Sequence, residues 1–336
     1  MFSFFKNFKT QIRSIQNLYG LPKKNTVEMK FDLHLPSRTT NGRLPYHCKE
    51  PIIFMHGIYG NRRLYIDDCK KLANYLQTPI YAVDARNHGD TENALPFNYD
   101  VLSNDLLHFI ETHNLKKPSL IGFSLGAKIA MLAVLKNPQK FTSVVCVDNV
   151  PMNQPVIIPF LTMFSKSLKT VISDSNISRY DKNWISKVSQ WMLTIVPAKD
   201  IVDYMAKNIT NKPSKYKEFT QNSVQNSLYS RVPVAKLYDV VINEVPAWPE
   251  HLVEDKQIQN PMLFIRASKS GFIEKPGVAA IQKYFNNYKI SSLDGTHLVM
   301  FERKQEYLQK VVEWFKITNS NLYGELTLKK PKSLRL

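Results

Sequence analysis

A short segment near the middle of the chain, Gly122-Phe123-Ser124-Leu125-Gly126, places a serine between two glycines at a junction of two kinds of secondary structure. The apolar residues before it are typical of a buried strand, and the pattern from Ala127 to Leu135 is typical of a helix. Glycine has no Cβ, so the strand and the helix can pack closely around a strained turn that exposes the serine hydroxyl. The segment therefore predicts a nucleophile elbow with Ser124 as the nucleophile.

Short apolar runs alternate with helix-length segments on both sides of this elbow. Strands are expected at 52–55, 80–83, 119–123, 144–147, 262–267 and 289–293, and helices at 63–76, 99–113 and about 302–316, with the pattern also continuing through 281–285. Such alternation favours an α/β fold in which helices flank a mostly parallel sheet. A single α/β domain with an insertion is the preferred organisation for 336 residues, although two domains would also fit.

The alternation stops after Pro151, and the next hundred residues show mostly helical patterns separated by prolines. We interpret residues 151–250 as a helical cap inserted between the two parts of an α/β-hydrolase core, 28–150 and 251–318. Within the cap, a helical stripe is formed by Trp184, Val188, Trp191 and Ile195. Such a stripe is more typical of packing than of a pocket, although its inner edge could exclude water from a reactive site.

Charge and cysteine content limit the classes of partner. The formal net charge is +17, but the basic residues are dispersed and form no array with aromatic side chains, so nucleic-acid binding is not expected. Cys48, Cys69 and Cys146 are too few and too scattered for a metal site or a disulfide framework, which favours a reducing compartment. No run of about 18 apolar residues predicts a transmembrane segment. The oligomeric state is not predicted.

The two ends of the chain have a distinctive composition. Residues 1–27 contain five lysines and arginines and no acidic residue, and apolar side chains recur on one helical face from Phe5 to Tyr19. This pattern is typical of a mitochondrial targeting segment, and an ordinary surface helix is the alternative. Residues 319–336 are basic and are expected to form a surface tail.

A serine nucleophile of this kind needs a base and an acid at the same edge of the sheet, in the chain order Ser, acid, His. His297 fits the base because it follows the last predicted strand. The usual position of the acid, after the strand at 262–267, carries no carboxylate until Glu274. Asp148 ends the preceding strand, so we select it as the acid that orients the His297 ring. The alternatives that remain are Asp84, Asp90 and Asp294, although aspartate after a strand commonly serves only a turn.

An oxyanion hole requires two backbone amides that point at the developing negative charge. The amide of Leu125 follows the nucleophile, and the amide of Ile58 lies in the loop after the strand at 52–55, so these two are the candidates. His56 and His88 follow early strands, and we interpret them as residues that orient loops and not as bases.

Four strings of the sequence resemble the mitochondrial α/β-hydrolase esterase group, and most closely its yeast ethanol acetyltransferase branch. They are Phe54-Met55-His56-Gly57, Asp84-Ala85-Arg86-Asn87-His88-Gly89, the elbow, and Val147-Asp148-Asn149-Val150-Pro151. The similarity spans nearly the whole chain. In that branch the acid stands at the Asp148 position, whereas other members of the group place it where this chain has Gly271.

This resemblance implies an alcohol O-acetyltransferase that makes ethyl acetate from acetyl-CoA and ethanol through an acetyl-serine intermediate, with thioesterase and esterase side activities. It also implies a mitochondrial location and no cofactor or metal, because acetyl-CoA is a substrate. One alternative is a mitochondrial carboxylesterase or thioesterase that uses water as the acceptor. Another is a catalytically silent binding protein with the same fold. The preferred alcohol, the acyl chain and the CoA-binding residues are not predicted.

Overall fold

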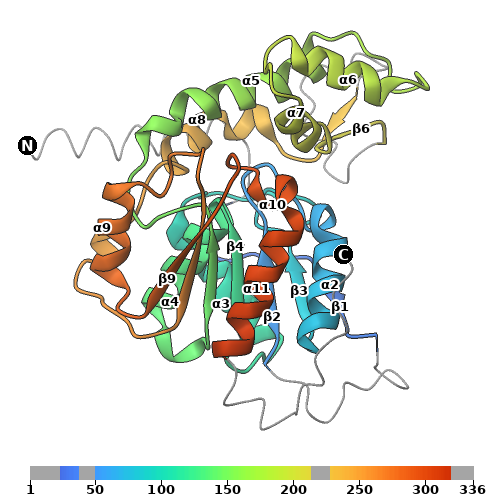
Figure 1. The fold of residues 1–336 in the computed structure, drawn as a ribbon. Coiled ribbons are helices and arrows are strands. Elements are labelled where there is room, and N and C mark those ends of the chain that lie inside the picture. The colour runs from blue at the N-terminus through green and yellow to red at the C-terminus, as the bar shows by residue number, and fades with distance from the viewer. Residues whose placement is uncertain (1–22, 38–49, 213–227, 319–336) are drawn as a thin grey trace, which may run out of the picture.

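A seven-stranded sheet forms the centre of the computed structural model, which describes residues 23–37, 50–212 and 228–318 (Figure 1). The strands lie in the order β1-β3-β2-β4-β5-β8-β9, and all neighbours are parallel except β1, which is antiparallel to β3. Their bounds are β1 (Phe31–His34), β2 (Ile52–Met55), β3 (Ile80–Val83), β4 (Ser119–Phe123), β5 (Val144–Val147), β8 (Met262–Ala267) and β9 (Tyr288–Leu293). The predicted α/β class with a mostly parallel sheet is confirmed.

Most predicted elements of the core are present at the expected positions, with four differences. The edge strand β1 was not predicted. The helix expected at 63–76 is divided into a 3₁₀ turn (Arg62–Tyr65) and α2 (Ile66–Leu76). The helix expected at about 302–316 corresponds to α11 (Lys304–Thr318), and a short helix that was not predicted, α10 (Val299–Glu302), precedes it. The segment 281–285 belongs largely to α9 (Lys275–Tyr284).

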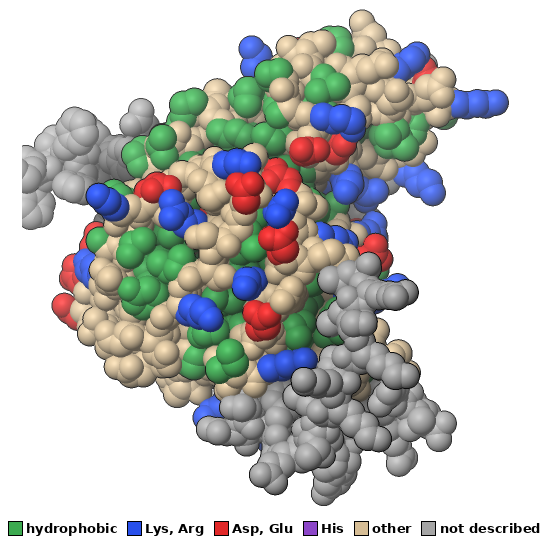
Figure 2. All heavy atoms as spheres, in the orientation of Figure 1, with side chains coloured by type: hydrophobic (Ala, Val, Ile, Leu, Met, Phe, Trp, Pro, Cys, Tyr) green, Lys and Arg blue, Asp and Glu red, His purple; other side chains and the backbone are tan. Residues whose placement is uncertain are grey.

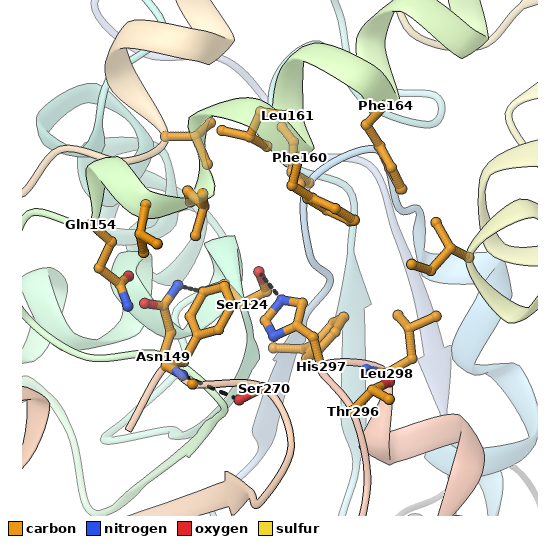
Figure 3. A pocket seen from close by; sticks show the side chains of 18 of the residues that line it. Ser124, Asn149, Gln154, Phe160, Leu161, Phe164, Ser270, Thr296, His297 and Leu298 are labelled. Carbon is orange, nitrogen blue, oxygen red and sulfur yellow. Dashed lines mark hydrogen bonds between the residues drawn. The ribbon is translucent and has the colours of Figure 1, made fainter. Parts of the chain in front are cut away.

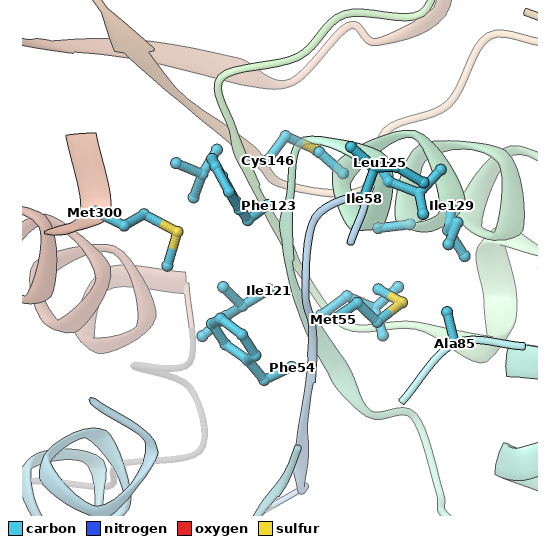
Figure 4. Packing of buried hydrophobic residues seen from close by; sticks show 14 of the residues in the cluster. Phe54, Met55, Ile58, Ala85, Ile121, Phe123, Leu125, Ile129, Cys146 and Met300 are labelled. Atoms are coloured by element: carbon cyan, nitrogen blue, oxygen red, sulfur yellow. The ribbon is translucent and has the colours of Figure 1, made fainter. Parts of the chain in front are cut away.

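Helices cover both faces of the sheet. On one side α3 (Tyr99–Thr112) packs against α4 (Leu125–Lys136), and on the other α2 packs against α11 (Figure 1). Every residue of β2, β4 and β5 is buried, as expected for parallel strands with both faces covered. Figure 4 shows the alternation: Phe54 and Ile121 point to one side of the sheet, and Met55 points toward α4.

The chain between β5 and β8 forms a separate layer over one end of the sheet (Figure 1). Its described part, which lacks residues 213–227, contains the α-helices α5 (Ile158–Ser173), α6 (Trp184–Leu193), α7 (Lys199–Ala206) and α8 (Val234–Glu244), and an antiparallel pair of two-residue strands, β6 (Ile209–Thr210) and β7 (Tyr229–Ser230). The strand pair was not predicted. Val188 is fully buried, and the other members of the α6 stripe pack partly buried against the core.

Two surface properties bear on the sequence predictions. On the face shown in Figure 2, lysine and arginine side chains are spread over both layers and mixed with acidic ones. One helical segment of the described chain, Pro155–Ser173, is long and apolar enough to cross a membrane by length and composition alone. This is weak evidence for a span, because the core helix of a soluble protein meets the same criterion.

The predictions for the two ends fall mostly outside the described residues. Of the predicted targeting segment only residues 23–27 are described, and the predicted tail at 319–336 lies wholly outside. The Val27 amide donates to Asp105 Oδ1 over 2.8 Å and the Lys24 amide donates to the Leu95 carbonyl over 2.8 Å. The Arg86 guanidinium donates to the Lys24 carbonyl. The backbone of this segment is therefore hydrogen-bonded to the core, and the Val27 side chain is buried, whereas residues 23–26 are exposed.

Candidate active site

The turn that carries Ser124 has the strained geometry expected of a nucleophile elbow. Ser124 lies between β4 and α4 with φ +51° and ψ −111°, a backbone conformation that side-chain-bearing residues rarely adopt. A Cβ on Gly122 would lie 2.3 Å from the carbonyl oxygen of Gly126, and a Cβ on Gly126 would lie 2.4 Å from the carbonyl oxygen of Met55. Neither position leaves space for a larger residue, so both glycines are required by the crossing of strand and helix.

The three predicted catalytic side chains meet at this turn. His297 Nε2 lies 2.9 Å from Ser124 Oγ, and His297 Nδ1 lies 2.8 Å from Asp148 Oδ2 (the serine–histidine contact is drawn in Figure 3). An ionised carboxylate can only accept, so Nδ1 carries the ring proton and Nε2 is free to accept the serine proton. The arrangement is that of a nucleophile, a base and a residue that orients the base.

Asp148 is held in place from both sides of its carboxylate. It is fully buried and lies directly after β5. Its Oδ1 accepts hydrogen bonds from the Ala267 amide and the Ser270 hydroxyl, each with a donor–acceptor distance of 3.0 Å. Both donors lie at the end of β8, the strand after which the acid would usually be found. The sequence interpretation did not identify Ser270.

The other carboxylates that the sequence left open are engaged elsewhere, and none of them is hydrogen-bonded to His297. Each carboxylate forms an ion pair with an arginine or a lysine. The partners are Arg62 for both Asp84 and Asp90, Lys269 for Asp294, and Arg266 for Glu274.

The two candidate oxyanion amides lie at the same end of the sheet. The Leu125 amide is the first of α4, and Ile58 follows β2 and lines the cavity above Ser124. Within the described part of the chain, neither amide donates to another protein group. The Tyr204 hydroxyl donates to the Ile58 carbonyl over 3.1 Å, which holds the backbone directly after the Ile58 amide. Both amides are therefore available to a negatively charged oxygen.

His56 and His88 hold the backbone of this loop. The Nε2 atom of His56 accepts from the Ala85 amide (3.1 Å) and its Nδ1 faces the next residue's carbonyl (2.8 Å). The Nε2 atom of His88 accepts from the Tyr59 amide (3.0 Å) and its Nδ1 faces the carbonyl two residues earlier (2.9 Å). Burial lowers the pKa of His56 to about 4 and the pKa of His88 to about 3, so both rings are neutral. Their contacts agree with the loop-orienting role predicted for them.

A cavity of about 370 Å³ lies directly over Ser124 and His297 (Figure 3). The α5 segment forms much of its wall, through Ile157, Phe160, Leu161 and Phe164. These residues stand at i, i+3, i+4 and i+7, a helical pattern that could have identified them from the sequence. None of the four residues of the predicted α6 stripe lines this cavity.

Polar and aromatic residues complete the lining. The Phe272 ring stacks on the His297 ring at 4.2 Å between centroids and an interplanar angle of 11°. Asn149 Nδ2 donates to the Ser124 carbonyl over 3.1 Å, and Gln154 stands near it on the same side of the cavity (Figure 3). The sequence interpretation assigned no role to these three residues, because a contact between distant loops leaves no local pattern.

Comparison with known proteins agrees with this geometry. A family model described as the alpha/beta hydrolase fold matches residues 50–304. The chain belongs to the α/β-hydrolase family. It is 47% identical over 308 residues to ethanol acetyltransferase 2 of Hanseniaspora uvarum, covering 92% of this chain and 88% of the relative. It is 45% identical over 309 residues to ethanol acetyltransferase 1 of Kluyveromyces marxianus, covering 91% and 85%.

The solved structures that resemble this chain have the same fold. A marine microorganism esterase superposes with a TM-score of 0.69 at 21% identity, covering 86% of this chain and 99% of the esterase. That likeness shows the fold. Together with the sequence relatives, the family establishes the chain as an enzyme of the acyltransferase or hydrolase type, as predicted. Among the described residues no group of three or more His, Cys, Asp or Glu could hold a metal ion.

Proposed function

We propose that this protein is an alcohol O-acetyltransferase that forms ethyl acetate from acetyl-CoA and ethanol through an acetyl-Ser124 intermediate. The observation that carries the proposal is the hydrogen-bonded series Ser124–His297–Asp148 beneath an apolar cavity, in a chain 45–47% identical to two ethanol acetyltransferases. The proposed reaction uses no cofactor or metal: acetyl-CoA is a substrate, and Ser124, His297 and the backbone amides supply the chemistry.

In the first half of the reaction, His297 Nε2 takes the proton of Ser124 as Oγ attacks the thioester carbonyl. The carbonyl oxygen becomes negatively charged and receives hydrogen bonds from the amides of Ile58 and Leu125. Collapse of this intermediate breaks the carbon–sulfur bond, and His297 returns the proton to the departing thiolate. Asp148 stabilises the positive charge on the histidine ring while it holds the proton.

In the second half, His297 removes the hydroxyl proton of ethanol as its oxygen attacks acetyl-Ser124. The oxyanion amides act again, and ethyl acetate leaves as Ser124 regains its proton. The apolar walls provided by α5 favour a small alcohol over bulk water near the acetyl group.

The decisive experiment supplies purified protein with acetyl-CoA, with and without ethanol, and measures ethyl acetate and free acetate. We expect acetate to fall as ethyl acetate rises, because both acceptors compete for one acetyl-enzyme. If Ser124→Ala abolished thioester hydrolysis but retained ester synthesis, ethanol would attack acetyl-CoA directly and the acetyl-serine would be excluded.

The second candidate is an esterase or thioesterase for which water is the acceptor. The His297 side chain is 22% exposed, so water can approach the same base. A product mixture that stays almost entirely acetate at saturating ethanol would favour this candidate. If the protein were a catalytically silent binding protein, a fluorophosphonate probe would not label Ser124 of the folded chain.

We also propose that the protein is mitochondrial and that the acid-free amphipathic leader directs it there. The backbone at residues 24 and 27 is hydrogen-bonded to the core, so removal should stop before it, and deletion of residues 1–20 should leave activity intact and abolish organelle location. Fluorescence of tagged full-length and truncated chains measures this, and a truncated chain that still enters mitochondria would contradict the proposal.

A further inference from the structure

Gln154 is a buried polar side chain whose role the proposed chemistry leaves open. It is 6% exposed and lines the cavity over Ser124 (Figure 3). Its Oε1 atom is buried, and no group in the described part of the chain donates a hydrogen bond to it. The backbone amide of Gln154 donates to the Pro246 carbonyl over 2.8 Å, so the residue is anchored at the entrance to α5.

An unpaired carboxamide oxygen in this position destabilises the folded protein. Leaving a buried polar group without a hydrogen bond destabilises a protein, because the group loses its hydrogen bonds to water and gains none in exchange. An apolar side chain of similar length would fill the same space without that cost. The arrangement is therefore that of a group whose hydrogen-bond partner arrives with a ligand.

The chemistry of the reaction limits what that partner is. Oε1 is an acceptor, so the ligand must present a donor. The reacting alcohol has one hydroxyl proton, and this proton must go to His297, while an acetyl group has no donor at all. The partner must then belong to the leaving group, and the thiol arm of CoA carries secondary amide N–H groups a few bonds from its sulfur.

The cavity is divided in a way that suits this assignment. In Figure 3, Gln154 and Asn149 stand on one side of Ser124, and Phe160, Phe164 and Leu298 stand on the other. The side chains of Gln154 and Asn149 can form hydrogen bonds with an amide-bearing arm, whereas the side chains of Phe160, Phe164 and Leu298 cannot. We infer that Gln154 accepts a hydrogen bond from an amide of the pantetheine arm and thereby selects amide-bearing thioesters over simple acetyl esters. This inference rests on the proposed use of acetyl-CoA.

The test replaces Gln154 with methionine, which keeps the length of the side chain and removes the acceptor. Acetyl-CoA is compared with p-nitrophenyl acetate, whose leaving group has no amide. We expect the ratio of kcat/KM for acetyl-CoA to that for the aryl ester to fall about 5- to 10-fold, the loss expected for one hydrogen bond, mainly through KM. Gln190→Met on the exposed side of α6 is the matched control and should leave the ratio unchanged.

A second measurement does not depend on turnover. Without ligand, Gln154→Met should raise the melting temperature by about 2–4 °C, because it removes an unpaired buried oxygen. In a Ser124→Ala background, calorimetry with acetyl-CoA should show weaker binding, again about 5- to 10-fold, when Gln154 is also replaced.

The outcomes separate the two proposals. If the wild type makes no ethyl acetate but Ser124→Ala binds acetyl-CoA in a Gln154-dependent way, the acetyltransferase proposal fails and the subsite stands. If Gln154→Met lowers activity toward both substrates equally, or leaves acetyl-CoA affinity unchanged, Gln154 does not recognise the thioester arm and the inference is wrong.

Discussion

Replacing Asp148 with asparagine should nearly abolish turnover, and the structure specifies why. The Ala267 amide donates to Asp148 Oδ1 and cannot reverse its polarity, so an asparagine at this position must keep its oxygen on that side. Its NH₂ group then faces His297 Nδ1, where Asp148 Oδ2 now accepts. The ring must accept at Nδ1 and carry its proton on Nε2, which faces Ser124 Oγ. In this tautomer His297 cannot take the serine proton.

We expect a loss of about 10,000-fold in kcat, which corresponds to about 5.4 kcal/mol of transition-state stabilisation. Steady-state assays with acetyl-CoA plus ethanol and with p-nitrophenyl acetate should show the same loss, because both use the same nucleophile. Glu274→Gln is the matched control, since Glu274 pairs with Arg266 and has no contact with His297. It should retain most of the activity. A loss below about 10-fold for Asp148→Asn, or a larger loss for Glu274→Gln, would refute the reasoning.

The remaining predictions concern the nucleophile, the loop histidines and the elbow. Ser124→Ala and His297→Ala should each abolish ester formation and thioester hydrolysis. The double variant should have almost the same kcat as either single variant, because the two residues act in one mechanism, and a loss of kcat equal to the product of the two single losses would contradict this. His56 and His88 have lowered pKa values of about 4 and 3, so the unfolded chain binds more protons below pH 6.5. The free energy of unfolding should therefore fall between pH 6.5 and 4 by up to about 1.4 kcal/mol per pH unit for each histidine, and a flat profile in equilibrium denaturation would argue against it. Gly126→Ala should lower the free energy of unfolding, measured in urea, by about 1–3 kcal/mol, because the added Cβ would clash with the Met55 carbonyl. A variant as stable as the wild type would show that the strand can move away.

The sheet could be predicted well where its strands are buried on both faces. The bounds of β2, β4 and β5 match their apolar runs because each run ends at a turn. The edge strand β1 escaped detection because its four residues, FDLH, mix polar and apolar side chains and are only partly buried. Its position depends on pairing with β3, an interaction distant in the sequence.

Ser124, Asp148 and His297 could be predicted because each follows a predicted strand, whereas the α5 residues that line the cavity were not predicted. The elbow is a local motif, so its pattern alone identified Ser124 and Leu125. The cap has several amphipathic helices, and no local motif distinguishes the helix that lines the cavity. Periodicity shows that a helix has an apolar face but does not show what that face covers. The α6 stripe packs on the protein and the α5 face lines the cavity, although the two patterns are equally clear in the sequence.

The position of Asp148 shows that the carboxylate that orients the catalytic histidine can come from either of two neighbouring strands. Since β5 and β8 are paired neighbours, with Val147 opposite Ile265, a side chain from either strand end can reach His297. In this chain β5 supplies the carboxylate, and the loop after β8 supplies the Ser270 hydroxyl that binds its other oxygen. Moving the acid to the later loop would therefore require more than a carboxylate there. The Ala267 amide would lose its present acceptor, and the buried end of β5 would need a neutral residue in place of Asp148.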